Sequence, residues 1–209
     1  MNTRRITDQY VRTLILGLAK DAKLSFPGLT CDQESLIYQQ LSSLGVDFRR
    51  SVIFSPVTNT IKSFDLNYIE LVLQHLSRSY SVIIKTSEGG HDLSNLADRY
   101  GVRYSIPPHG IFEVSRLIGS HVAISSGLAY LLAIFQCGCE LVHIIPADES
   151  GWVINNGMKV PSTNCSFYGE IACQPVNNVK ELWLPPNDLS LVQQRLLSWG
   201  GFVLNVDGH

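Results

Sequence analysis

The sequence predicts an α/β domain built on a doubly wound, mainly parallel β-sheet. Five short segments rich in β-branched residues alternate with segments of helical periodicity. Glycine or proline follows most of these segments, as expected where a helix or a buried strand ends. Such alternation is typical of βα units, whose right-handed crossovers place helices on both faces of a parallel sheet.

The predicted elements follow one another in a regular order. The strands are short and apolar, and they are expected at 51–55, 81–85, 102–106, 121–124 and 140–145. Helical spacing of apolar residues predicts helices at 65–76, 92–100, 111–118 and 127–135. Asp65 is placed to cap the first of these helices, whereas Gly101 and Gly119 are placed at the C′ positions that end the second and the third.

The segment before this core is predicted to be helical. Residues 1–50 carry two helix-like patterns, at 7–22 and 33–44. Thr30 stands three residues before a glutamine, which is the spacing of a capping box. We expect residues 1–50 to form a helical extension packed on a single domain of residues 51–209.

The segment after the core is less regular. Residues 147–180 are rich in asparagine, glycine, serine and proline, and they are expected to form a long loop with at most one strand. Residues 185–188 then open a final helix that runs to Leu197, and residues 202–206 have the composition of a further strand.

The composition excludes several classes of protein. Hydrophobic residues make up 45% of the 209, which supports a sizeable core and excludes a disordered chain. The net charge is −2 with no basic cluster beyond Arg4 and Arg5, so no nucleic acid partner is expected. Apolar runs are far shorter than the roughly 20 residues of a membrane span, and the N-terminus lacks the apolar segment of a secretory signal. We expect a cytoplasmic protein without a membrane span.

The five cysteines do not form a recognisable framework. Their number is odd, and none of them shows the paired C-x-x-C spacing of a structural zinc site. Neither disulfides nor a metal site are therefore expected.

Candidate ligand-binding residues gather in the loops that follow the predicted strands. In doubly wound sheets, ligands bind outside the carboxyl ends of the strands. The residues singled out there are small, polar or charged: Thr58, Asn59, Lys62, Glu88, Gly89, His109, Ser125, Ser126 and Gly127. Hydroxyls and a glycine at a helix start favour a phosphate, which Lys62 would also attract. Glu88 is suited to accept the hydroxyls of a ribose or a sugar.

Other interpretations of these residues remain open. Glycine and serine are also ordinary turn residues, and His143, inside a predicted strand, is interpreted as a satisfied core residue. The sequence contains no G-x-G-x-x-G after the first strand, no P-loop and no G-x-S-x-G motif. A dinucleotide-binding fold, a P-loop kinase and an α/β-hydrolase are thus not expected.

The order of motifs resembles the carboxyl-terminal half of the family 9 glycosyltransferases, which are heptosyltransferase-like enzymes of lipopolysaccharide assembly. Ser55-Pro56 stands where that family has His-Pro, and Lys62-Ser-Phe64 resembles its lysine-aromatic step. Ser125 and Tyr130 replace the aspartate and the histidine of its Asp-(Ser/Thr)-Gly-x-x-His motif. The stretch from Cys165 to the Leu184-Pro-Pro-Asn-Asp-Leu segment resembles the family's tail, so the resemblance covers about residues 51–200.

This resemblance implies a Rossmann-like donor-binding half of a GT-B type glycosyltransferase, with a nucleoside diphosphate sugar as donor and no other cofactor. Lys62 and the helix start at Ser125, Ser126 and Gly127 would hold the pyrophosphate, while Glu88 and Gly89 would line the nucleoside or sugar pocket. Two domains of about 150 residues do not fit in 209. The acceptor-binding half is therefore expected in another chain or in a longer protein.

Two functions from different classes remain. In the first, the chain binds a nucleotide-sugar and transfers, or helps to transfer, a hexose or heptose to a glycan or protein acceptor. No carboxylate is assigned as the acceptor-activating base, so the catalytic residues are unknown. In the second, it is a non-catalytic interaction or scaffold domain of a polysaccharide or protein-modification complex. A pyruvyl- or epimerase-like transferase is a weaker third.

A missing acceptor half would leave one wall of the cleft uncovered. Exposed apolar residues usually mark an interface. The residues expected on this wall are Ile61, Phe64, Ile111, Phe112 and Trp152. Either a homodimer or an acceptor-binding partner chain would cover them.

Overall fold

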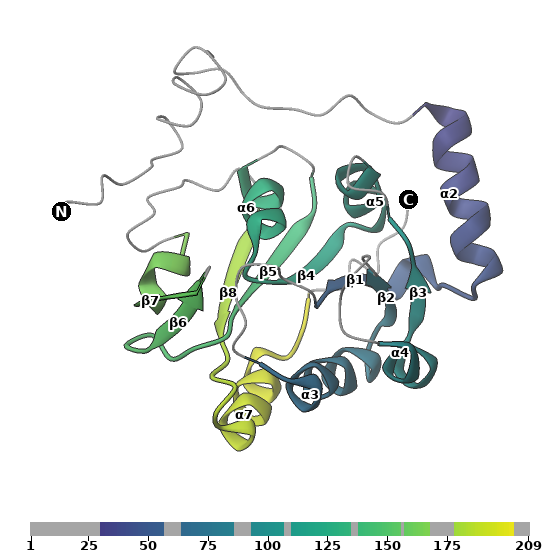
Figure 1. Cartoon of the computed structure of the whole chain (residues 1–209). Coiled ribbons are helices and arrows are strands. Elements are labelled where there is room, and N and C mark those ends of the chain that lie inside the picture. Colours follow the sequence, from purple (N-terminus) through teal and green to yellow (C-terminus); the bar gives the residue numbers. More distant parts are fainter. Residues whose placement is uncertain are drawn as a thin grey trace, which may run out of the picture.

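The computed structural model describes residues 30–56, 64–85, 93–106, 110–134, 138–155, 157–167 and 178–202. Its centre is a six-stranded sheet in which all neighbouring strands are parallel (Figure 1). The strands lie in the order β3-β2-β1-β4-β5-β8. Their bounds are β1 Ser51–Ser55, β2 Ser81–Lys85, β3 Val102–Tyr104, β4 Ser120–Ile124, β5 Glu140–Ile145 and β8 Val179–Trp183. The predicted doubly wound parallel sheet is confirmed.

Helices cover both faces of this sheet. Figure 1 shows α5 (Ile111–Ile118) and α6 (Gly127–Ile134) on one face, and α3 (Leu66–Ser77), α4 (Ser94–Tyr100) and α7 (Leu189–Trp199) on the other. The helix α2 (Cys31–Ser43) lies beside β3, where the hydroxyl of Tyr104 donates to Gln40 Oε1 at 2.6 Å. None of the helices in the described ranges is long and apolar enough to cross a membrane.

Each face of the sheet has its own apolar core. On the face of α3, α4 and α7, alternate strand residues such as Phe54, Ile84 and Ile144 are fully buried. On the face of α5 and α6, the core contains Ile53 and Ile83, and Leu41 of α2 joins it. Successive strand residues point to opposite faces, which explains why neighbours such as Ile53 and Phe54 belong to different cores.

Local sequence signals are confirmed at several element ends. The carboxylate of Asp65 accepts a hydrogen bond from the Tyr68 amide at 3.0 Å and so caps α3. Thr30 and Gln33 form the predicted capping box at the start of α2. Gly119 ends α5 in the left-handed conformation, with φ of 81°.

The prediction that Gly101 ends α4 is confirmed, since it directly follows Tyr100 and its amide donates to the Ala97 carbonyl at 2.9 Å. Its φ of −178° is extended backbone, so it ends the helix without the left-handed conformation that Gly119 adopts. A Cβ at this position would lie only 2.3 Å from the carbonyl oxygen of Val82. Glycine is therefore needed because the chain passes close to β2 where it turns into β3.

The loop predicted at 147–180 is also partly wrong. It contains an antiparallel hairpin, β6 (Trp152–Asn155) and β7 (Met158–Pro161), and the beginning of β8, which is the sixth strand of the main sheet. Lys180 and Glu181 interrupt the apolar residues of β8, as expected for an edge strand. The pattern predicted at 7–22 and most of that at 202–206 lie outside the described residues.

Candidate functional site

The strand order defines a switch point between β1 and β4. From β1 the chain proceeds outward through β2 to β3, and from β4 it proceeds in the other direction through β5 to β8. Ligands of open α/β sheets bind at the carboxyl ends of the strands at such a point. Here those ends are Ser55 of β1 and Ser125, which directly follows β4.

Three of the predicted ligand-binding residues lie at this switch point. Gly127 is exposed and begins α6, and Ser126 is half-buried, with its hydroxyl accepting from the Ala129 amide at 3.4 Å. Ser125 is only 1% exposed, and its hydroxyl donates a hydrogen bond to the sulfur of Cys165. Ser126 and Gly127 can therefore face a ligand, whereas the side chain of Ser125 faces the interior.

The other six predicted residues cannot be placed. Thr58, Asn59, Lys62, Glu88, Gly89 and His109 lie outside the described residues. Their assignment to a ligand site stays a prediction.

A row of polar residues crosses the sheet near the carboxyl ends of its strands, on the face covered by α5 and α6. The pairing of neighbouring strands aligns one residue from each strand. From β3 to β8 the row consists of Tyr104, Lys85, Ser55, Ala123, His143 and Glu181. Sequence analysis missed this row because its members lie far apart in the chain, five of them inside predicted strands and Glu181 where no strand was predicted.

Ser55 belongs to a buried chain of hydrogen bonds that crosses from β1 to α5. Its hydroxyl lies 2.8 Å from His121 Nε2, and the hydroxyl of Ser115 lies 2.8 Å from His121 Nδ1. Ser115 donates its own proton to the carbonyl of Ile111 at 2.6 Å. It must therefore accept from His121 Nδ1, which leaves Nε2 to accept from Ser55.

These contacts resemble a serine nucleophile beside a histidine base, but the energetics favour a structural role. Burial lowers the pKa of His121, and the nearby charge of Lys85 adds to this effect, so that the pKa falls to about 3. A general base is most effective with a pKa near the working pH. Ser55 is 3% exposed and His121 is fully buried. The chain of hydrogen bonds thus ties α5 to the sheet through a neutral imidazole.

The other end of the polar row is organised by Glu181. Its carboxylate accepts hydrogen bonds from the hydroxyl of Ser166 at 2.7 Å and from the amide of Phe167 at 2.5 Å. Burial would raise the pKa of Glu181, but His143, Ser166 and Phe167 outweigh it and hold that pKa below its usual value. Glu181 is therefore an ionised anchor for the segment around Ser166.

His143 lies between this anchor and α6. Its Nδ1 is 3.6 Å from Glu181 Oε1, and its ring packs against those of Tyr130 and Phe167. The ring is fully buried, yet neither nitrogen has a hydrogen-bond partner. Burial lowers the pKa of His143, although Glu181 opposes this. The prediction of a core residue is confirmed, but the prediction that it is satisfied is wrong, because the Glu181 carboxylate is held by Ser166 and Phe167.

The residues that replace the aspartate and histidine of the resembled motif face inward. The hydroxyl of Tyr130 donates to the carbonyl of Cys165 at 3.0 Å, and the hydroxyl of Ser125 donates to the sulfur of the same residue. Burial raises the pKa of the Cys165 thiol. Both side chains thus hold the segment at Cys165 against α6.

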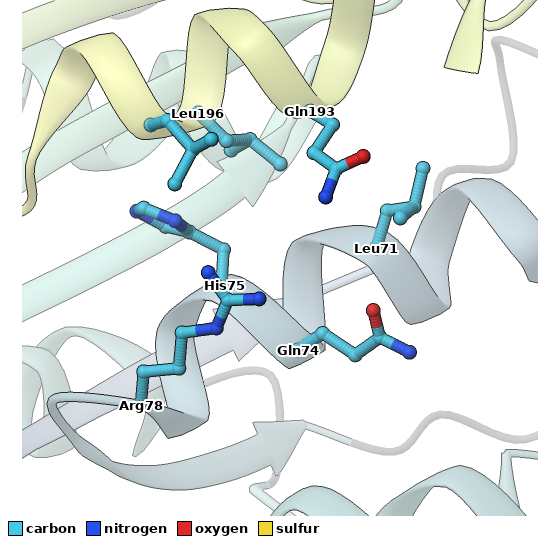
Figure 2. A pocket seen from close by; sticks show the side chains of 7 residues that line it. Leu71, Gln74, His75, Arg78, Gln193 and Leu196 are labelled. Carbon is cyan, nitrogen blue, oxygen red and sulfur yellow. The ribbon is translucent and has the colours of Figure 1, made fainter. Parts of the chain in front are cut away.

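No group of three or more histidine, cysteine, aspartate or glutamate side chains in the described ranges is placed to hold a metal ion. A surface hollow lies instead between α3 and α7, where Leu71 and His75 face Gln193 and Leu196 (Figure 2). Burial and the nearby Arg78 lower the pKa of His75. This hollow is on the opposite face of the sheet from α6, so it is separate from the switch-point residues.

The predicted apolar wall is only partly present. Ile111 and Phe112 are 1% and 5% exposed, so their assignment to an open wall is wrong. They lie on the apolar side of α5, which packs against the sheet. Phe64 is half-buried and packs on Tyr68, with ring centroids 5.4 Å apart. Trp152 is 56% exposed, as expected.

The fifth residue predicted on that wall, Ile61, lies outside the described residues. The wall therefore has one clearly exposed member, on the hairpin that follows β5.

Of the three comparisons with known proteins, the one with solved structures bears on the fold. The sequence matches no protein-family model and no curated protein. The structure is similar to the crystal structure of the glycosyl transferase family 9 protein from Veillonella parvula DSM 2008, with a TM-score of 0.58 and 9% sequence identity. The match covers 95% of this chain and 53% of that chain, so this chain spans about half of its length. The likeness shows a Rossmann-like fold shared with a GT-B glycosyltransferase.

Proposed function

We propose that this chain is the donor-binding domain of a glycosyltransferase-like protein and that it binds a nucleoside diphosphate sugar. The observation that carries the proposal is the switch point between β1 and β4, with Ser126 and Gly127 opening α6 beside it. The fold likeness to a family 9 glycosyltransferase supports the same class of ligand. A helix start with free backbone amides and hydroxyls suits a diphosphate.

The wider function follows from this proposal. The domain would present the donor in the cytoplasm, and an acceptor-binding half would supply the glycan or protein that receives a hexose or heptose. That half would come from another chain, from a second copy or from a longer protein. The chain spans about half of its structural neighbour, which is consistent with a separate acceptor half.

The proposal is tested by thermal melting of the protein with uridine, guanosine and adenosine diphosphates. A ligand that binds the folded state stabilises it by mass action, by about 2.7 kcal/mol at a concentration of 100 Kd. At least one nucleotide is expected to raise the melting temperature. Flat melting curves with all three, together with flat calorimetry, would exclude a donor site.

A matched pair of variants locates the site. Gly127 is exposed, and a Cβ there meets nothing within 4 Å, so both Gly127→Ala and Gly127→Asp are expected to fold. An aspartate at a helix start is favourable in the free protein but repels a diphosphate. Gly127→Asp should therefore abolish the nucleotide shift, whereas Gly127→Ala should keep it. Equal shifts in both variants would place the nucleotide elsewhere.

A non-catalytic interaction domain is the second candidate, and one observation favours it. The residues that replace the family's aspartate and histidine, Ser125 and Tyr130, use their hydroxyls to hold Cys165. They therefore offer no polar group to a donor. Under this alternative, no nucleotide shifts the melting temperature, and the carboxyl-end surface serves only to contact a partner.

A further inference from the structure

Lys85 is the most unusual charged residue of the described chain. It ends β2, and it lies on the same face as Ile83, under the side of the sheet that α5 and α6 cover. It is half-buried, and burial lowers the pKa of its ammonium group. A partly desolvated ammonium group is costly unless an anion lies beside it.

No such anion is present among the described side chains. Every ion pair formed by these residues involves other cations, and none joins a carboxylate to Lys85. The one carboxylate of the polar row, that of Glu181, lies four strand spacings away, which is roughly 19 Å. Its carboxylate is already held by Ser166 and Phe167.

The nearer neighbours of Lys85 are neutral. In the row, Tyr104 is paired with it on β3, and Ser55 follows it on β1. Burial raises the pKa of Tyr104, so its phenol is not ionised at neutral pH. His121 is close enough for the charge of Lys85 to lower its pKa, and both of its nitrogens are engaged by serines. Among the residues that the structure describes, the neighbours of the ammonium group therefore carry no compensating charge.

The position of Lys85 indicates where that charge comes from. The residue stands at the carboxyl end of β2, one strand from the switch point, on the edge of the sheet where α/β folds bind ligands. A lysine ammonium offers three hydrogen-bond donors and acts as a point charge for phosphate. A doubly charged phosphate group compensates a desolvated ammonium better than a single carboxylate does.

We propose that Lys85 is the cationic residue of an anion-binding site at the carboxyl end of β2, and that its ligand is a phosphate or diphosphate group. The choice of a diphosphate as the ligand rests on the proposed function, whereas the anion site itself is inferred from Lys85 alone. The neutral chain of hydrogen bonds through Ser55, His121 and Ser115 then supports this site. It holds α5 on the sheet without placing a second charge beside the ligand.

The test is calorimetry of the full chain with inorganic pyrophosphate. Three proteins are compared: the unchanged chain, Lys85→Met and, as a matched control, Lys180→Met on the exposed side of β8. The unchanged chain should bind pyrophosphate, Lys85→Met should bind at least tenfold more weakly, and Lys180→Met should bind within about twofold of the unchanged chain. Lys85→Arg keeps the charge and should restore most of the binding.

A melting experiment without ligand separates this from misfolding. Because Lys85→Met removes an unpaired, partly desolvated charge, its melting temperature should equal or exceed that of the unchanged protein. A Lys85→Met protein that melts normally and binds pyrophosphate with unchanged affinity would overturn the inference. So would an unchanged chain that binds no pyrophosphate at millimolar concentration.

The outcome for nucleotides is read separately. If a nucleoside diphosphate binds the unchanged chain and Lys85→Met equally, the donor-binding function stands and the role of Lys85 is wrong. If pyrophosphate binding depends on Lys85 and no nucleotide binds, the anion site stands and the donor-binding function is wrong.

Discussion

The two faces of the central sheet differ in the polarity of the side chains that they bury. Towards α3, α4 and α7, the strands present Phe54, Ile84 and Ile144, and hydrophobic contacts fill the interior. Towards α5 and α6, the same strands present a row that is apolar except for His121, followed nearer their carboxyl ends by a row that is polar except for Ala123. Phe54 and Ser55 are consecutive residues on opposite faces, so the apolar face and the polar row meet within a single strand.

This contrast separates packing from function. An apolar face gains stability in proportion to the area that it buries. A buried polar group contributes little when it is satisfied and is costly when it is not. On the polar face both nitrogens of His121 have hydrogen-bond partners, whereas among the described residues those of His143 have none and no carboxylate pairs with Lys85. Uncompensated groups near the carboxyl ends therefore mark the part of the fold that packing alone does not explain.

The largest expected difference between the faces is in their response to acid. Burial, together with the nearby charge of Lys85, lowers the pKa of His121 from 6.5 to about 3, so between these values the unfolded chain binds a proton that the folded chain does not. Stability contributed by the neutral ring is complete above pH 6.5 and is lost as the pH falls towards 3. The loss is on the order of 5 kcal/mol over the whole window.

Urea unfolding measured from about pH 7 to about pH 4 tests this prediction. His121→Gln should be less stable at neutral pH but should lose less stability with falling pH. His75→Gln, which replaces a half-buried histidine on the apolar face, is the control and should change the slope less. An identical acid slope in the unchanged protein and in His121→Gln would contradict the assigned titration.

The second expected effect belongs to the apolar face. Phe54 is fully buried in the centre of β1, and Phe54→Ala removes its ring and leaves a cavity. The free energy of unfolding should fall by about 3–5 kcal/mol. Phe54→Leu keeps most of the volume and should cost clearly less. Urea denaturation of both variants measures the difference, and a loss below about 1 kcal/mol for the alanine variant would show that this face repacks freely.

The contrast between the faces also shows which parts of the structure could be predicted from the sequence. Strands such as β1, β2 and β5 were predictable, since runs of β-branched residues ending in proline or a polar loop are a local signal. The caps at Asp65 and Thr30 are local as well. On the apolar face, the strands β1, β2 and β5 need little beyond this pattern, since alternate residues such as Phe54, Ile84 and Ile144 are buried there.

The polar row was not predictable in the same way. Lys85, Ser55, His143 and Glu181 are aligned in one row only through the strand order and the register of the sheet. The strand β8 completes the row. Its charged residues Lys180 and Glu181 gave it no strand pattern, so the strand was not predicted. The need for glycine at position 101 was missed for a similar reason, since it comes from Val82 on another strand. Long-range pairing therefore determines the part of the site that local patterns do not reveal.

A third, smaller effect compares Ser55 with its neighbour Phe54. Ser55→Ala removes the donor to His121 Nε2 and leaves a buried nitrogen unsatisfied. The expected cost is about 1–3 kcal/mol, which is less than that of Phe54→Ala. Ser43→Ala removes an exposed hydroxyl that donates to the Gln40 carbonyl, and it should cost less than about 0.5 kcal/mol. Equal losses for the two serine variants would mean that the buried chain of hydrogen bonds adds no stability.

The smallest expected effect concerns a residue that belongs to neither face. Trp152 lies on the β6–β7 hairpin, 56% exposed, with the ammonium group of Lys159 lying 5.3 Å from the ring centroid. Its neighbour Val153 points the other way and is 1% exposed. Trp152→Ser should therefore change the free energy of unfolding by less than about 0.5 kcal/mol, whereas Val153→Ala should cost more.

The same two variants test whether the hairpin contacts a second copy of the chain. In that case the unchanged protein should self-associate in sedimentation experiments, and Trp152→Ser should weaken the self-association. A folded Val153→Ala protein should self-associate as the unchanged protein does. If Trp152→Ser self-associates as strongly as the unchanged protein, the contact between copies lies on another surface. If the unchanged protein is monomeric at micromolar concentration, Trp152 does not contact a second copy.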